Sequence, residues 1–148
     1  MSQEPLTEAI QHYLREIYKL AHEDEPVSVS ALARAQDVSP ASASAMVKKL
    51  AALRLAEHAP YGGITLTPAG EKVALEVIRH HRLLELYLAE TLGVHVDDVH
   101  DEAEKLEHVI SEELEERIDR ALGFPTHDPH GDPIPDRNLE WPGGRKSA

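Results

Sequence analysis

Carboxylate and imidazole side chains with the spacing of metal ligands gather in one acidic stretch, residues 100–108. In an uninterrupted helix, Glu104, Glu107 and His108 would fall within an arc of about 100°, and His100 would join them from one turn earlier. The opposite side of that helix would be apolar, with Val99, Ala103, Leu106 and Ile110. The stretch therefore predicts a helix that buries one side and offers metal ligands on the other.

A second group of candidate ligands lies earlier in the chain, where His80 and His81 precede Glu85. His81 and Glu85 are four residues apart, so they would be neighbours on a helix surface. Oxygen and nitrogen donors in a chain without cysteine suit Mn(II) or Fe(II) better than a structural zinc or Cu(I). A solvated acidic helix face is the alternative, and it stays open on these residues alone.

Charge is unevenly distributed along the 148 residues, although the formal net charge of −12 would by itself argue against nucleic acid. Residues 28–54 carry four basic side chains against one acidic one, whereas residues 97–120 carry eleven acidic side chains against three basic ones. One region can approach phosphate and the other can collect cations. The chain has no secretory signal, no apolar run near 18 residues and no cysteine, so we expect a cytoplasmic protein.

The first third of the chain has the pattern of a helix-turn-helix. An apolar stripe predicts a helix from Pro5 to about Ala21, and Ser28 or Ser30 can cap a short helix over residues 31–36. After a tight connection, Ser39 is an N-cap candidate and Pro40 takes the first position of a helix that reaches about residue 53. Two helices joined by so short a turn indicate a helix-turn-helix.

A β-hairpin follows, with strands expected at residues 55–59 and 64–67, and Thr67-Pro68 then starts a long helix. Three helices and a hairpin make a winged helix. This order of elements favours a DNA-binding domain over the alternative, an ordinary helical hairpin in a bundle. The third helix would enter the major groove, and small residues at positions 41–45 let it approach closely. The expected DNA-contacting residues are Ser39, Pro40, Ser42, Ser44, Lys48 and Lys49.

From Pro68 to Leu92 the helix has more apolar surface than one exposed helix can carry, so it needs partners. We expect these to be a helix over residues 96–110, a short helix that Ser111 caps, and a second subunit. The expected fold is mainly α, with a winged-helix domain (1–72), a helical dimerisation and metal-binding domain (73–124) and a Pro/Gly-rich irregular tail (125–148).

The winged helix, the long helix with His81-Arg82-Leu83 and Glu85, and the stretch from His100 to Ser111 together resemble the diphtheria toxin repressor and manganese transport regulator family of metal-dependent repressors. The resemblance covers about residues 10–135 and implies a winged-helix domain followed by a helical dimerisation domain. It also implies a metal site whose ligands are His12, Glu104, Glu107 and His108. A neighbouring site would use His81, Glu85 and His100.

Two positions depart from the family pattern. His12 stands where iron-sensing members have methionine and manganese-sensing members have aspartate, and Arg15 stands where manganese regulators tend to have a second carboxylate. Glu104 matches the manganese branch, because the iron branch has cysteine there. The resemblance thus favours Mn(II), with Fe(II) as the alternative.

Longer family members carry an SH3-like domain after a linker resembling residues 125–135, so we expect either a natural short form without that domain or a shortened piece of a longer protein. In this linker His127, Asp128, His130 and Asp132 are also potential ligands, but we expect a solvated segment.

The function implied is that of a dimeric repressor that binds operators of metal-homeostasis genes when a divalent metal is bound. One alternative is a winged-helix regulator that ignores metals and responds to a small organic effector. A di-metal carboxylate enzyme would need Glu-x-x-His pairs on facing helices, and the residue three before His108 is Lys105. We therefore expect no enzyme activity.

Overall fold

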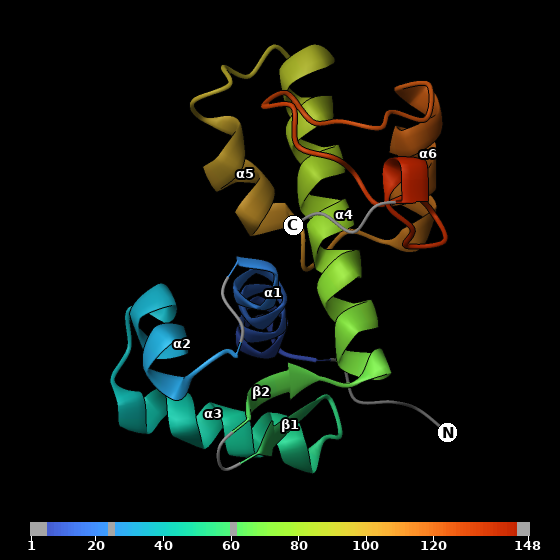
Figure 1. The fold of residues 1–148 in the computed structure, drawn as a ribbon. Coiled ribbons are helices and arrows are strands. Elements are labelled where there is room, and N and C mark those ends of the chain that lie inside the picture. Colours follow the sequence, from blue (N-terminus) through green and yellow to red (C-terminus); the bar gives the residue numbers. More distant parts are fainter. Residues whose placement is uncertain (1–5, 24–25, 60–61, 145–148) are drawn as a thin grey trace. The chain divides into compact units, whose positions relative to one another are not determined.

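The chain folds into two compact units, residues 1–74 and residues 75–147. The structure, a computed structural model, describes residues 6–23, 26–59 and 62–144 (Figure 1). None of the described helices combines the length and the apolarity needed to cross a membrane. Each unit has its own buried residues, and each is described by itself below.

Three helices open the first unit, and their ends follow from capping residues. They are α1 (Glu8–Glu23), α2 (Val29–Gln36) and α3 (Pro40–Ala52). The Ser28 side chain accepts a hydrogen bond from the amide of Ala31, and the Ser39 side chain accepts one from the amide of Ser42. These N-caps satisfy backbone donors that the helix itself leaves unpaired. The predicted helix-turn-helix is confirmed, while the predicted start of the first helix at Pro5 lies outside the described residues.

A two-stranded antiparallel hairpin completes this unit, formed by β1 (Ala56–Ala59) and β2 (Gly63–Leu66). Part of its predicted turn, residues 60–61, lies outside the described residues. Helix α1 packs against α2 and β2, and α3 packs against α2 and β1. Leu14, Leu32, Leu50 and Ile64 are among the fully buried residues of these elements. Three helices followed by this hairpin make the winged helix expected from the sequence.

Helix α4 (Pro68–Glu90) starts at the end of the first unit and supplies the central helix of the second. Thr67 caps it, since its side chain accepts a hydrogen bond from the amide of Gly70. In the second unit, α5 (Val99–Leu106) and α6 (Glu112–Ala121) accompany α4 (Figure 1). One apolar cluster joins the three helices through Leu84, Leu88, Val99, Ala103 and Ile118. The unit is therefore helical, as predicted.

The segment after α6 contains no strand or α-helix among its described residues, and a short 3-10 helix, η1 (Pro142–Gly144), ends it. It is nevertheless packed against the unit, because Ile134 is 1% exposed and joins a cluster with Leu83 and Leu86 of α4. Two α4 arginines also donate hydrogen bonds to its backbone, Arg79 to the oxygen of Pro135 and Arg82 to that of Pro133. The irregular conformation was predicted. The expectation of a solvated linker holds for His127, His130 and Asp132, which are exposed, but it was wrong for Asp128, which is buried.

Helix α5 is shorter than the predicted helix over residues 96–110. It ends at Leu106, and residues 107–109 form a turn. The expectation that Glu104, Glu107 and His108 share one face of a continuous helix was therefore wrong. Leu106, expected on the buried side, is 40% exposed, whereas Glu107 is 1% exposed. Glu107 itself is the C-cap: it keeps αR backbone angles, and its amide donates a hydrogen bond to the oxygen of Ala103.

Candidate metal centre and DNA-facing helix

Helices α4 and α5 bring three of the predicted ligands together in the second unit. His81 and Glu85 lie one turn apart on α4, with Nε2 of His81 3.2 Å from Oε2 of Glu85. His100 reaches the same place from α5, with its Nδ1 3.1 Å from Nε2 of His81 and 3.6 Å from Oε2 of Glu85. Two ligands of one ion, each about 2.0–2.6 Å from it, lie at most about 5 Å apart, so these spacings fit a common cation.

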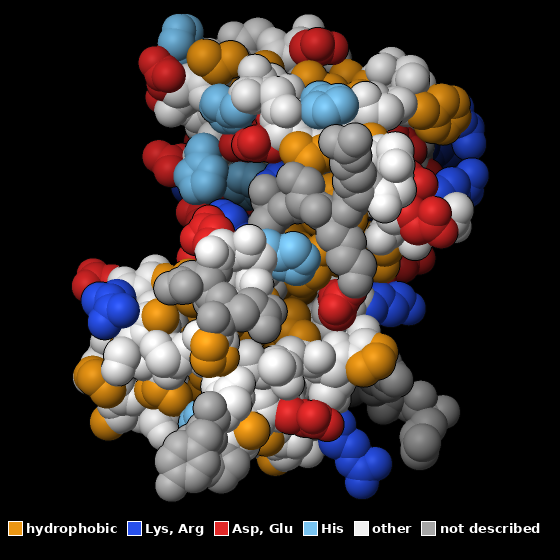
Figure 2. Space-filling view, in the orientation of Figure 1, with side chains coloured by type: hydrophobic (Ala, Val, Ile, Leu, Met, Phe, Trp, Pro, Cys, Tyr) orange, Lys and Arg blue, Asp and Glu red, His pale blue; other side chains and the backbone are white. Residues whose placement is uncertain are grey.

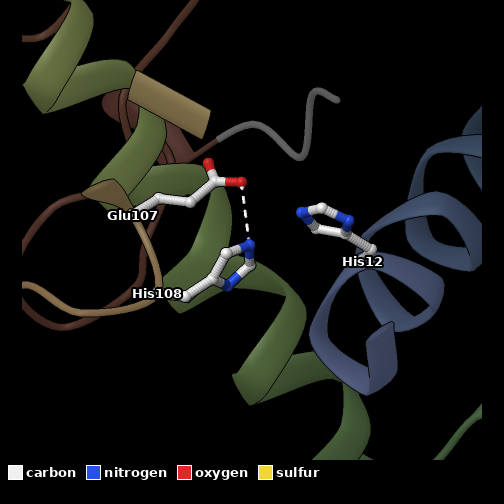
Figure 3. Close-up of side chains that lie close together, drawn as sticks. All are labelled: His12, Glu107 and His108. Carbon is white, nitrogen blue, oxygen red and sulfur yellow. Dashed lines mark ion pairs between the residues drawn. The ribbon is translucent and has the colours of Figure 1, made fainter. Parts of the chain in front are cut away.

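Glu107 connects this group to His108. Its Oε2 lies 2.6 Å from Nδ1 of His81. Its Oε1 lies 3.2 Å from Nε2 of His108, an ion pair drawn in Figure 3. The backbone oxygen of Glu107 also lies 3.1 Å from Nδ1 of His80. A buried carboxylate held between two imidazoles is a chemically reasonable ligand for a divalent cation, because the cation would neutralise it. These mixed oxygen and nitrogen donors fit the first-row ions favoured from the sequence.

The electrostatics of His81 reflect these acidic neighbours. Burial lowers the pKa of His81, but its hydrogen bonds to Glu107 and Glu85 and their negative charges outweigh that effect and raise the pKa to about 9. For Glu85, burial raises the pKa, and the hydrogen bond and charge of His81 lower it further than burial raises it. In the metal-free protein a proton on His81 thus partly balances the carboxylates. A metal ion bound to His81 would take the place of that proton.

Glu104 lies on the last turns of α5, where its Oε1 is 3.9 Å from Nε2 of His100. Its side chain is 37% exposed. The carboxylate is thus on the side of α5 that carries His100, and solvent reaches it.

Two further potential ligands, Asp128 and His130, lie in the segment expected to be a solvated linker, on the side of the other oxygen of Glu85. Nδ1 of His130 lies 3.8 Å from Oε1 of Glu85 and 3.9 Å from Oδ2 of Asp128. The Asp128 side chain is 1% exposed. The Asp128-Pro129-His130 sequence was visible, but sequence spacing cannot show that a segment more than forty residues after Glu85 folds back onto α4.

A second buried charged cluster lies beside this site and has a structural character. Arg79 pairs with Glu115 and with Asp119, and Nε2 of His80 lies 2.6 Å from Oε2 of Glu115. Burial raises the pKa of Glu115, and the hydrogen bond and charge of His80, together with Arg79, lower it further than burial raises it. These contacts join α4 to α6. These ion pairs hold α6 against α4 next to the residues that carry the candidate ligands.

His12, the remaining predicted ligand, lies on α1 of the first unit and is half-buried (Figure 3). The predicted DNA-contacting residues also belong to the first unit, at the start and along the outside of α3. Ser39, Pro40, Ser42, Lys48 and Lys49 are exposed, and Ser44 is half-buried. The space-filling view shows histidine and acidic side chains near one another on the visible face of the second unit (Figure 2).

Comparison with known proteins agrees with this arrangement of two units. Residues 5–64 match the N-terminal DNA binding domain of iron dependent repressors, and residues 67–136 match the iron dependent repressor metal binding and dimerisation domain. The chain belongs to the iron-dependent repressor family. This is the family that the His100–Ser111 stretch and the winged helix indicated.

Particular relatives support the assignment. The chain is 35% identical over 130 residues to the diphtheria toxin repressor of Corynebacterium efficiens, covering 88% of this chain and 56% of that protein. It is 34% identical over 114 residues to an HTH-type transcriptional regulator of Methanocaldococcus jannaschii, covering 76% of this chain and 91% of that one. A solved manganese-dependent transcriptional repressor in complex with manganese is 47% identical, with a TM-score of 0.81, covering 90% of this chain and 61% of that one. The chain thus spans little more than half the length of some relatives.

Proposed function

We propose that this protein is a metal-responsive transcriptional repressor that binds operator DNA as a dimer when a divalent metal is bound. The observation that carries the proposal is the buried Glu107 carboxylate between His81 and His108, in the metal binding and dimerisation region of a winged-helix protein. The manganese-dependent repressor, at 47% identity, supports Mn(II) as the preferred ion, with Fe(II) as the alternative.

The proposed ligands of the regulatory ion are His12, Glu104, Glu107 and His108, and His81, Glu85 and His100 would form a neighbouring site. A bound divalent cation supplies positive charge that neutralises these carboxylates and a fixed link among the side chains that hold it. Oε1 of Glu107, which lies beside His108, would face the cation, while Oε2 would keep its hydrogen bond from Nδ1 of His81. His12 would connect the first unit to this ligand set, which is the role that the family resemblance implies for its position.

The DNA-binding role rests on α3 of the winged helix. Its exposed Ser39 and Ser42 can donate hydrogen bonds to phosphates or base edges, and Lys48 and Lys49 can neutralise phosphates. If metal and operator favour the same arrangement of the chain, each raises the affinity for the other by the same factor. Such couplings typically amount to about 1–3 kcal/mol, which corresponds to about 5- to 150-fold in operator affinity.

Operator binding by metal-site variants tests the proposal. DNA fragments would be selected from a random-sequence pool with the parent protein and Mn(II), and their affinity would then be measured with Mn(II) and with a chelator. Glu104→Ala and His108→Ala should lose the metal stimulation and remain folded. Glu102→Ala is the matched control, since Glu102 is an exposed carboxylate on the same helix that pairs with Lys105. Stimulation that survives in both ligand variants would contradict the proposed site.

Comparing ions on the same DNA addresses the metal preference and the effector alternative. We expect stimulation with Mn(II) to equal or exceed that with Fe(II) and Zn(II) at equal free concentrations. A regulator that responds to an organic effector would show the same operator affinity with and without every metal.

A further inference from the structure

His80 and His81 are consecutive residues of α4, and both contact the same residue of the turn after α5. His81 holds the Glu107 side chain, since its Nδ1 lies 2.6 Å from Oε2 of that carboxylate. His80 holds the Glu107 main chain, since its Nδ1 lies 3.1 Å from the backbone oxygen. His80 is not among the proposed ligands of either metal site. Its contact therefore acts on a proposed ligand from outside the ligand set.

We propose that His80 is a positioning residue of the proposed regulatory site: it fixes the turn over residues 107–109 against α4, and the Mn(II) affinity of that site depends on this contact. The inference rests on the proposed function, because Glu107 and His108 are proposed ligands of the regulatory ion. It goes beyond that function by giving a role in metal binding to a residue that need not touch the ion.

The turn after α5 is held to that helix by backbone hydrogen bonds. The Glu107 amide donates to the oxygen of Ala103, and the Val109 amide donates to the oxygen of Leu106. Both bonds run back to the helix that the turn leaves, so they restrain rotation of the turn about the end of α5 only weakly. His80 adds a contact from a second helix. Held by both α4 and α5, the turn can shift its two ligand side chains much less.

The contact uses a carbonyl group at the C-terminal end of a helix. The last carbonyls of an α-helix find no donor within the helix, and side chains commonly satisfy them. Glu107 is the C-cap of α5, and His80 offers a donor to its oxygen. The place where α5 ends is thus recognised by a side chain of α4.

The other ring nitrogen of His80 is held by α6. Its Nε2 lies 2.6 Å from Oε2 of Glu115, whose other carboxylate oxygen pairs with Arg79. Burial lowers the pKa of His80, but the hydrogen bond to Glu115 and the charge of Glu115 raise it further than burial lowers it. Both neighbours of the ring are acceptors, so the ring donates a hydrogen bond from each nitrogen. It cannot turn away from the Glu107 oxygen without giving up its bond to Glu115.

The size of the effect follows from the precision that a metal site needs. Ligands must stay within about 0.5 Å of the geometry that binds the ion. Removing a partner that orients a ligand typically costs about 10- to 100-fold in metal affinity. Because Glu107 and His108 are neighbours on one turn, a shift of that turn would misplace both.

Three substitutions of His80 separate its contact with Glu107 from its contact with Glu115. In His80→Asn the amide nitrogen can take the place of Nδ1 and donate to the Glu107 oxygen. In His80→Gln the longer side chain can bring its amide nitrogen near the position of Nε2 and donate to Glu115. His80→Ala removes both contacts.

The Mn(II) affinity would be measured without DNA, by counting free Mn(II) through its electron paramagnetic resonance signal. A His100→Ala background weakens the neighbouring site, so that the regulatory site dominates. We expect His80→Ala and His80→Gln to lose about tenfold or more in affinity, and His80→Asn to stay within about threefold of the parent. His95→Ala is the matched control and should bind as the parent does, since His95 is an exposed histidine of the loop between α4 and α5.

Urea unfolding of the same variants identifies a purely structural role. The free energy of unfolding should follow the contact with Glu115, so His80→Gln should be more stable than His80→Asn, which is the reverse of the expected order of affinities. If the Mn(II) affinities follow the order of stabilities, or if His80→Asn binds Mn(II) as weakly as His80→Ala, then His80 only joins α4 to α6 and the inference is wrong.

Operator binding by the parent protein keeps this inference distinct from the proposed function. A parent whose operator binding responds to Mn(II), with His80 variants that all bind Mn(II) as tightly as the parent, would refute the positioning role and leave the proposed function standing. The expected order of Mn(II) affinities without any operator response would refute the proposed function and leave the positioning role of His80 in Mn(II) binding standing.

Discussion

The raised pKa of His81 makes a quantitative prediction about metal binding near neutral pH. With a pKa of about 9, His81 carries a proton on both ring nitrogens at pH 7, where only about 1% of the side chain is neutral. A metal ion at Nε2 must displace one proton, while the Nδ1 proton can stay in the hydrogen bond to Glu107. Mn(II) binding at this site should therefore release about one proton per ion.

The size of the effect follows from the same pKa. Between pH 7 and pH 8 the neutral fraction of a group with a pKa of about 9 rises nearly tenfold, so the Mn(II) affinity should rise about tenfold. An imidazole with the ordinary pKa of 6.5 would change by only about 1.3-fold over this range. Measuring the Mn(II) affinity at pH 7 and at pH 8 therefore distinguishes a raised His81 pKa from an ordinary one.

The measurement is calorimetric titration with Mn(II) under nitrogen, in two buffers with different ionisation enthalpies, to count the released protons. The His108→Ala background removes the proposed regulatory site, so that the neighbouring site dominates. His81→Ala in that background should bind more weakly and lose most of the pH dependence. An affinity that changes less than about twofold between pH 7 and pH 8, or binding without proton release, would refute the reasoning from the Glu107–His81 contact.

Four other outcomes follow from the structure. In the metal-free protein the raised pKa of His81 contributes stability that is complete below about pH 6.5 and is lost as the pH rises through about 9. The free energy of unfolding in urea should therefore decline over that pH range, and His81→Asn should make this decline smaller. Arg79→Ala would remove the arginine from buried Asp119 and leave Glu115 with His80 alone, and it should lower the free energy of unfolding by about 3–5 kcal/mol, measured by urea unfolding. Replacing Lys48 and Lys49 with alanine should weaken binding to all DNA sequences. The slope of log affinity against log salt concentration should fall by the amount expected for the loss of up to about two phosphate contacts. Gly70→Ala would place a Cβ atom 1.9 Å from the backbone oxygen of Leu55. The free energy of unfolding, measured by thermal unfolding, should therefore fall by at least about 1–3 kcal/mol.

The first unit was largely predictable from the sequence because its signals are local. Ser28 and Ser39 cap the helices that they were expected to cap, and Pro40 opens α3. The spacing of apolar residues predicted α1. The two strands lie within one residue of their predicted bounds. Each of these features depends on residues only a few positions apart.

The candidate site was predictable in its residue types but only partly in its geometry. His81, Glu85 and His100 come together as the resemblance implied, because α4 and α5 pack through a shared apolar cluster. The predicted extent of the helix to residue 110 was wrong, because α5 ends at Leu106 and the apolar spacing does not signal the turn over residues 107–109. The contribution of Asp128 depends on contacts between α4 and a segment far along the chain, such as the hydrogen bond from Arg82 to the Pro133 oxygen. Local patterns carry no information about such contacts.

The early end of α5 has a consequence for ion selectivity. Glu104 sits on regular helix, whereas Glu107 and His108 sit on a turn, where small backbone rotations can change how far a side chain reaches. If these residues hold the ion as proposed, such a ligand set, part on helix and part on a turn, can follow cations of somewhat different radius without unfolding α5. Discrimination among divalent ions would then come less from a fixed spacing of the ligands than from donor chemistry and from the supply of each ion in the cell.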